Sequence, residues 1–235
     1  MDELLSNVYD ARIKMKKNDY ITSIFYHPWA ACLDFYYTIN FRNTERLKQL
    51  DDKGFVMLPK HQSALDIILE GMLLKRVLGR YGNYVMKDSL PKWLEYIGGI
   101  SITQGKHLKR MLKKNKNRHS KRDILQEAKE RRDYVDNTIL NLLLMDEIVV
   151  VHSEGTRSYK EPFSINVPNI KKLLDIQKKL GKDLTFVPLN IKYEDKSKYR
   201  SSIELIVGNP INVPDNGLDK LVEHLMIEIP NNVTF

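Results

Sequence analysis

A histidine and an aspartate five positions apart offer the first candidate chemistry. His61 and Asp66 follow the apolar run Gly54–Pro59, which predicts a short buried strand. A helix is predicted from Ala64 to about Leu78, with Ser63 as its N-cap and Asp66 leaning back towards His61. The carboxylate would accept one imidazole N–H and leave the other ring nitrogen as a base. The same residues also fit a capping box that serves only the helix end.

A second polar turn follows Glu147–Val151, the clearest buried-strand run in the sequence. It reads His152-Ser153-Glu154-Gly155-Thr156-Arg157-Ser158. Gly155 permits a tight turn, Thr156 can donate a hydroxyl, and the planar fork of Arg157 suits a phosphate. The alternative interpretation is a strand-end turn with a solvated arginine.

Together the two stretches resemble the glycerolipid acyltransferase family, the 1-acylglycerol-3-phosphate acyltransferases and their relatives. Members carry an Asn-His-x-x-x-x-Asp block and, farther along, a Pro-Glu-Gly-Thr-Arg-Ser block, whose places are taken by residues 60–66 and 153–158. Gly98–Gln104 looks like the second block of the family, and Phe186–Ile191 looks like the fourth. The four blocks keep the family's order over about residues 55 to 191.

Three places depart from the family's pattern. Lys60 stands where an asparagine is usual, and His152-Ser153 replaces Phe-Pro. Thr103-Gln104 ends the second block, which normally closes with Asp-Arg or a similar pair. Two interpretations remain open: the role of that arginine is lost, or Lys106 takes it.

The resemblance implies a role for each matched residue. His61 would remove the proton from the acceptor hydroxyl, and Asp66 would fix its tautomer and stabilise the imidazolium. Val187 and Pro188 would contact the acyl chain or the donor. The residues expected at the acceptor phosphate are Glu154, Gly155, Thr156, Arg157 and Lys106.

The expected reaction is acyl transfer from acyl-CoA or acyl carrier protein to the hydroxyl of a lysophospholipid such as 1-acylglycerol-3-phosphate, in phospholipid biosynthesis. Glycerol-3-phosphate or another lysophospholipid is the alternative acceptor. No serine or cysteine elbow is visible, so direct attack in a ternary complex is favoured. No metal and no cofactor are expected. A non-catalytic membrane-peripheral or nucleic-acid-binding protein on the same fold is the alternative from another class.

Length and pattern predict one α/β domain. The 235 residues suffice for one core, and seven strand candidates indicate a central, mostly parallel or mixed sheet flanked by helices. We expect residues 1–41 to form a helical segment that could lie at the membrane interface, and residues 42–235 to form the acyltransferase domain. Pro188 lies inside the predicted strand Thr185–Tyr193, which suggests an edge strand, a bulge or a pocket wall.

The net charge of +8 is concentrated in one segment. A basic helical stretch is predicted at 106–137, in two helices broken near Lys114 to Ser120, and its part 106–132 holds twelve Lys or Arg against three acids. A solvated face and attraction to anionic lipid headgroups are both open. Nucleic acid is not expected as a partner, because no aromatic residue interleaves the charges before Tyr134.

The stretch Tyr20–Phe41 is crowded with aromatic and apolar residues but is interrupted by His27, Pro28 and Asp34, so a membrane-spanning helix is not expected. It suits either the lipid headgroup level or an ordinary core helix pair. The lone Cys32 suits a reducing compartment, and no signal-peptide pattern is visible. We expect a cytoplasmic protein, peripheral on the inner face of an anionic membrane.

Overall fold

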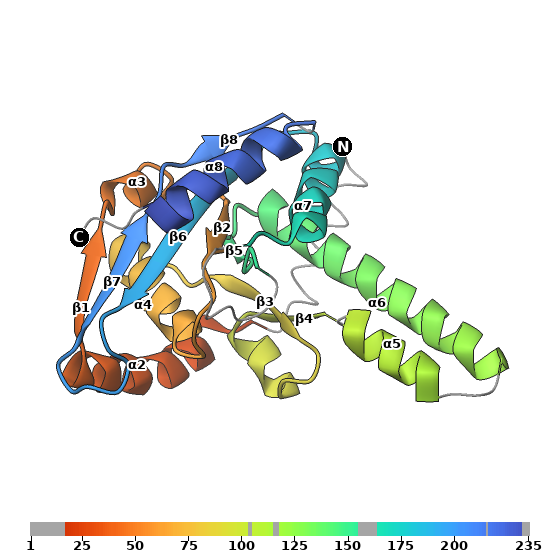
Figure 1. The fold of residues 1–235 in the computed structure, drawn as a ribbon, viewed down its shortest axis with the longest axis horizontal. Coiled ribbons are helices and arrows are strands. Elements are labelled where there is room, and N and C mark those ends of the chain that lie inside the picture. Colours follow the sequence, from red (N-terminus) through yellow and green to blue (C-terminus); the bar gives the residue numbers. More distant parts are fainter. Residues whose placement is uncertain (1–16, 103–104, 115–117, 155–163, 215, 232–235) are drawn as a thin grey trace.

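The computed structural model describes residues 17–102, 105–114, 118–154, 164–214 and 216–231 (Figure 1). The strands within these residues are β1 (Thr38–Arg42), β2 (Val56–Pro59), β3 (Asn83–Lys87), β4 (Gly99–Ile102), β5 (Val149–Val150), β6 (Thr185–Tyr193), β7 (Ser202–Val207) and β8 (Ile211–Asn212). The helices are α2 (Asp19–Tyr36), α3 (Glu45–Lys48), α4 (Asp66–Leu78), the 3-10 helix η1 (Lys92–Ile97), α5 (Gly105–Lys114), α6 (Arg118–Leu144), α7 (Val167–Leu180) and α8 (Leu218–Asn231).

The strands form one mixed sheet in the order β1-β7-β6-β2-β5-β3-β4, and β8 pairs with β6. All pairings are parallel except those of β6 with β7 and with β8. The predicted α/β class and the seven predicted strands are therefore confirmed. The short strand β8 was not predicted, since its two residues follow a turn and show no strand pattern of their own.

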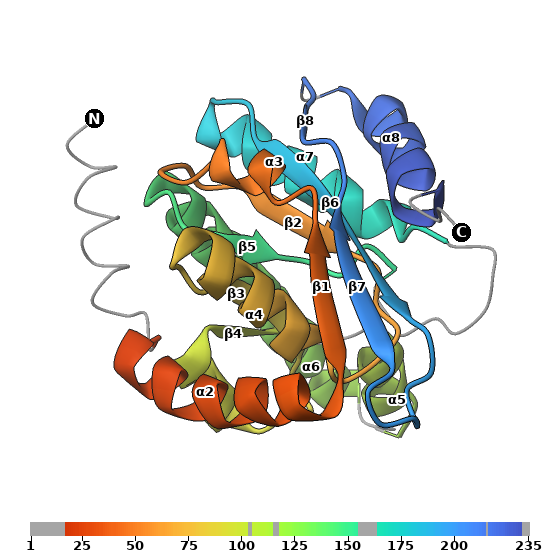
Figure 2. The same ribbon diagram turned by 90° about the vertical axis from the view of Figure 1, so that its left-hand side faces the viewer.

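Helices cover both faces of the sheet (Figure 2). Alternate residues of the buried strands point to opposite faces, so Met57 packs with α2, α3 and α4, while Val56 and Leu58 pack with α6, α7 and α8. A sheet buried on both sides needs near-continuous apolar runs, which is what β2 and β5 carry. Helices α4 and α7 are followed by the C-cap residues Gly79 and Gly181, both with left-handed backbone angles, as is usual after a helix C-terminus.

Pro188 lies inside the sheet, so of the three alternatives given for Thr185–Tyr193 the edge strand is wrong. Strand β6 pairs with β2 on one side and with β7 and β8 on the other. The Pro188 carbonyl accepts a hydrogen bond from the Gly208 N–H (2.9 Å) on the side of β7 and β8. The missing N–H of Pro188 points to the same side, where β6 changes its partner from β8 to β7, so no ladder bond is lost.

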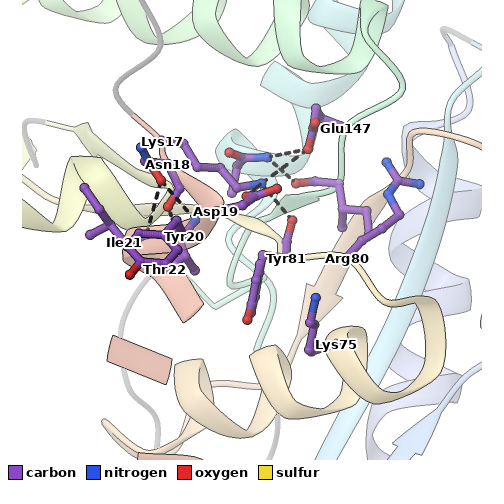
Figure 3. Close-up of polar contacts among 12 residues, drawn as sticks. Lys17, Asn18, Asp19, Tyr20, Ile21, Thr22, Lys75, Arg80, Tyr81 and Glu147 are labelled. Atoms are coloured by element: carbon purple, nitrogen blue, oxygen red, sulfur yellow. Dashed lines mark hydrogen bonds and ion pairs between the residues drawn. The ribbon is translucent and has the colours of Figure 1, made fainter. Parts of the chain in front are cut away.

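Helix α2 is anchored to the body at its first turn (Figure 3). The Asn18 side chain accepts hydrogen bonds from the N–H groups of Tyr20 (2.9 Å) and Ile21 (3.2 Å), which caps the helix. The Lys17 ammonium donates to the Tyr81 carbonyl (3.0 Å) and to Glu147 (3.4 Å). These contacts set the path of α2 across α4 on the face that Figure 2 shows in front.

The basic stretch forms two helices, as predicted, with α5 ending at Lys114 and α6 beginning at Arg118. Described lysine and arginine side chains on α5 and on the first half of α6 are exposed, including Lys109, Arg110 and Arg132. The second half of α6 is different, since Val135, Ile139 and Leu142 pack in the core. The charges are thus carried by the part of α6 that extends away from the sheet (Figure 1).

Candidate active site

Two strand ends bring the predicted motifs together. Strands β2 and β5 are adjacent and parallel, so the loops that follow them leave the same edge of the sheet. His61 lies in the first loop and His152 in the second, and their ring centroids are 4.0 Å apart with an interplanar angle of 30°. The side chains are only 14% and 10% exposed. Residues 91 positions apart in sequence therefore form one buried cluster.

Asp66 is fully buried at the start of α4 and collects four hydrogen bonds. Its Oδ2 lies 3.0 Å from Nδ1 of His61 and accepts from the backbone N–H groups of Gln62 (2.6 Å) and Ser63 (2.7 Å). The Tyr193 hydroxyl donates to Oδ1. Burial raises the pKa of Asp66, but the hydrogen bonds from His61, Tyr193, Ser63 and Gln62 outweigh it and hold the pKa below its ordinary value of 3.8.

An ionised Asp66 fixes the tautomer of His61. The carboxylate can only accept, so the imidazole must carry its proton on Nδ1. Nε2 then has its lone pair free, and it has no hydrogen-bond partner among the described residues. This is the arrangement of a general base whose second nitrogen is held by a carboxylate.

Tyr193, the last residue of β6, contacts Asp66 from the neighbouring strand end. Burial raises the pKa of its phenol, and the negative charge of Asp66 raises it further, so the hydroxyl stays protonated and can donate. The Lys196 ammonium lies over the Tyr193 ring, 4.2 Å from its centroid. Sequence reasoning did not find Tyr193, because a tyrosine at a strand end carries no signal that links it to a helix 127 residues away.

Glu154 ties the second motif to the first. Its Oε2 accepts the backbone N–H of His61 (3.0 Å), and the side chain is buried. Next to it, the Ser153 N–H and hydroxyl donate to the Pro59 carbonyl (3.4 and 3.3 Å). The loop after β5 therefore holds the backbone of the loop that carries His61.

A second histidine–carboxylate pair lies beside the first. Nε2 of His152 is 3.1 Å from Oε1 of Glu70, which is fully buried one helical turn after Asp66 on α4. Burial lowers the pKa of His152, but the charge and hydrogen bond of Glu70, with the charges of Asp66 and Glu154, raise it above 6.5 overall. A lone glutamate in the apolar run of residues 67–74 was the available sequence signal for Glu70.

The other predicted site residues divide into two groups. Gly155, Thr156 and Arg157 lie outside the described residues, as does the side chain of Lys106, whose backbone lies in α5. Val187 and Pro188 are buried in β6, opposite Met57 and Leu58 of β2. Their expected contacts with phosphate and with donor stay predictions.

The predicted N-cap role of Ser63 is wrong. Helix α4 begins at Asp66, and its N-cap residue, Leu65, makes no side-chain capping bond. The Ser63 hydroxyl instead accepts the Leu65 N–H (3.2 Å), inside the loop that Asp66 holds. The turn is two residues longer than predicted, and the backbone N–H groups of Gln62 and Ser63 in it donate to the Asp66 carboxylate.

The sequence model of the Acyltransferase family matches residues 38–192. The chain belongs to the Acyltransferase family. The matched region of this acyltransferase runs from β1 to β6, so it includes His61 and Asp66, the loop after β5, and all but the last residue of the strand that ends in Tyr193. A search of curated proteins found no match. Among the helices that the structure describes, none is long and apolar enough to cross a membrane.

Proposed function

We propose that this acyltransferase moves a fatty acyl group from an acyl thioester, acyl-CoA or acyl carrier protein, to the hydroxyl of a lysophospholipid such as 1-acylglycerol-3-phosphate, in phospholipid biosynthesis. The observation that carries the proposal is the buried Asp66 carboxylate at 3.0 Å from Nδ1 of His61, which leaves Nε2 as a base. A base is what the attack of an alcohol on a thioester requires, because a neutral hydroxyl is a weak nucleophile.

The proposed chemistry runs through one tetrahedral intermediate. Nε2 of His61 takes the hydroxyl proton as the acceptor oxygen attacks the thioester carbonyl carbon, which forms the new C–O bond. Asp66 stabilises the imidazolium. When the intermediate collapses, the C–S bond breaks, and the imidazolium returns the proton to the departing thiolate. Ester and free thiol leave, and His61 is again neutral.

The acceptor phosphate is assigned to the residues after Glu154. Glu154, the residue before them, accepts a hydrogen bond from the His61 backbone N–H, which supports this assignment. Arg157 offers a bidentate fork for phosphate, with Gly155 and Thr156 supplying backbone and hydroxyl donors. Lys106 takes the place of the arginine that the second block lacks. Holding the phosphate orients the hydroxyl, which reduces the entropy cost of the reaction.

The donor is assigned to the region of Val187 and Pro188, beside β2. Both side chains are buried in the sheet. We assign to them the apolar surface that the donor contacts next to the loop of His61. The residue before His61, Lys60, donates its backbone N–H to the Leu189 carbonyl (2.9 Å), which joins this loop to β6.

Docking to an anionic membrane is assigned to the edge of the molecule next to the site. The loop 194–201 follows β6 and carries exposed Tyr199, Lys198 and Arg200. The Tyr199 ring contacts the exposed ring of Phe35 on α2, with centroids 5.8 Å apart. Exposed aromatic rings beside cationic side chains suit the headgroup level of an anionic bilayer.

This edge is linked directly to the base. The hydroxyl of Tyr37, the residue after α2, donates to the Lys196 carbonyl (2.6 Å), and Lys196 lies over the ring of Tyr193, which donates to Asp66. The proposed membrane-facing edge and the proposed base therefore belong to one network of contacts. We assign this membrane-docking edge to the cytoplasmic face of the membrane.

The test is a thiol-release assay with acyl-CoA and acyl carrier protein donors and a panel of acceptors: 1-acylglycerol-3-phosphate, other lysophospholipids and glycerol-3-phosphate. We expect thiol release that depends on a lysophospholipid and is lost in His61→Ala. Thiol release that occurs only with glycerol-3-phosphate would make glycerol-3-phosphate, and not a lysophospholipid, the acceptor. No acceptor-dependent release with any pair would favour the non-catalytic alternative.

A further inference from the structure

The pair His152–Glu70 lies directly against the pair His61–Asp66, and the proposed reaction does not use it. The two imidazole rings are in contact at 4.0 Å between centroids. Both carboxylates come from the same face of α4, four residues apart, and both are fully buried. The site therefore holds two adjacent histidine–carboxylate pairs, of which the proposed reaction uses only His61 and Asp66.

The second pair is not explained by stability. Buried ion pairs gain little over well-packed apolar residues of the same volume, and Glu70 is poorly satisfied because its Oε2 has no hydrogen-bond partner among the described residues. A buried Tyr84 hydroxyl is also without a partner there, and the charge of Glu70 adds to burial in raising the pKa of that phenol. An expensive buried cluster in contact with a base points to a role in catalysis.

The charges around the two rings explain what such a role would be. Asp66 and Glu70 on α4 and Glu154 after β5 place three carboxylates around them. Among the described residues, the other charged or titratable groups near the cluster include Lys60, which precedes His61 and is buried, Lys196, which lies over the Tyr193 ring, and the neutral phenols of Tyr84 on β3 and Tyr193 on β6. An imidazole surrounded by more carboxylates than cations binds a proton tightly, and a protonated imidazole is not a base.

We propose that His152, held by Glu70, is a positioning residue for His61: its ring fixes the plane of the catalytic imidazole, and its positive charge keeps that imidazole unprotonated at neutral pH. The proton that the carboxylates attract is bound by His152, whose Nε2 faces Glu70. A further proton on His61, beside the protonated His152, would put two like charges on rings whose centroids are 4.0 Å apart. The proposal rests on the base role of His61.

The test measures the protonation of His61 directly, by NMR titration of the ring resonances in protein labelled at its six histidines. Glu70→Gln keeps both rings but removes the charge that holds the proton on His152. His152→Phe combined with Glu70→Leu keeps an aromatic stack and removes the buried pair together, which guards against misfolding from an unpaired carboxylate. His224→Gln, on α8, is the matched control.

We expect the midpoint of the His61 titration to rise by about one pH unit in Glu70→Gln, a tenfold change in its protonation equilibrium. The double variant should move it in the same direction, and His224→Gln should leave it unchanged. The acid limb of kcat/KM should shift upward with the midpoint, which a purely structural residue would not cause.

A His61 midpoint that stays within about 0.3 unit, a twofold change, in both folded variants would overturn the proposal and leave His152 as a packing residue. The two hypotheses fail separately. If His61→Ala keeps its activity, the proposed function fails while the titration still reports the coupling. If His61→Ala is inactive and the midpoint does not move, only the role of His152 fails.

Discussion

Asp66→Asn tests the central pair, because the structure predicts which way the new amide will face. Oδ2 of Asp66 receives three N–H donors, from His61, Gln62 and Ser63, whereas Oδ1 receives only the Tyr193 hydroxyl. The amide oxygen must take the Oδ2 position, since an NH₂ group there would face three donors. The NH₂ group then faces Tyr193, whose hydroxyl can rotate and accept.

The expected fall in kcat for Asp66→Asn follows from the interactions that the substitution leaves in place. His61 keeps a proton on Nδ1 and an unprotonated Nε2, so only the charge that stabilises the imidazolium is lost. Two unit charges about 4 Å apart attract by about 4 kcal/mol at an effective dielectric constant of about 20. We therefore expect kcat to fall by about 10²- to 10³-fold with little change in KM. An inverted tautomer would cost more, about 10⁴-fold.

The assay is thiol release under acceptor saturation, with Asp136→Asn as the matched control. Asp136 also pairs with a cation, Lys172, at 3.0 Å, but on α6 and away from the site. A kcat within about threefold of the unsubstituted enzyme would refute the reasoning and return Asp66 to a helix-end role. A loss near 10⁴-fold would instead contradict the predicted orientation of the amide.

The same variant tests the pH dependence of stability. The folded pKa of Asp66 lies below its ordinary 3.8, so its contribution to stability is present above about pH 4 and is lost as the pH falls through the lower folded value. The unsubstituted protein should thus lose unfolding free energy in this acid range, and Asp66→Asn should lose less. Urea titrations at several pH values between about 2.5 and 5 measure the difference; equal losses in the two proteins would argue against a depressed pKa.

The remaining predictions concern the base, its support and the two assigned surfaces. His61→Ala should lower turnover at least about 10²-fold with a normal thermal unfolding curve, and an active variant would remove His61 from the mechanism. Tyr193→Phe removes a hydrogen bond to a carboxylate and should lower the unfolding free energy by about 1.5–3 kcal/mol in urea titrations; no loss would mean that the bond contributes nothing. Arg157→Ala should raise the KM for a phosphate-bearing acceptor, whereas unchanged acceptor saturation would indicate a structural role. Phe35→Ser with Tyr199→Ser should weaken sedimentation with anionic vesicles but not kcat for a soluble short-chain acceptor, and salt should weaken binding further; equal binding to neutral vesicles would count against the assigned edge.

Local pattern was enough to predict the strands and the pairing of His61 with Asp66. The runs Gly54–Pro59 and Glu147–Val151 predict buried strands, and the fully buried strands β2 and β5 within them confirm this, because burial requires apolar side chains whatever the neighbouring strand is. The pairing of His61 with Asp66 could also be predicted, since a single short turn of the chain joins the two residues. The exact start of α4 was not predicted, because helix ends are set by the local geometry of the preceding turn, which the residue pattern does not show.

Only the tertiary structure decided which distant residues support that pair. Tyr193, Glu154 and His152 reach it because β2 lies between β5 and β6, and strand order depends on the packing of the whole sheet rather than on any one segment. The same holds for Pro188, whose missing N–H is tolerated in an interior strand because two different partners meet beside it. Sequence determines the chemistry available at each strand end, and long-range packing determines which strand ends are neighbours.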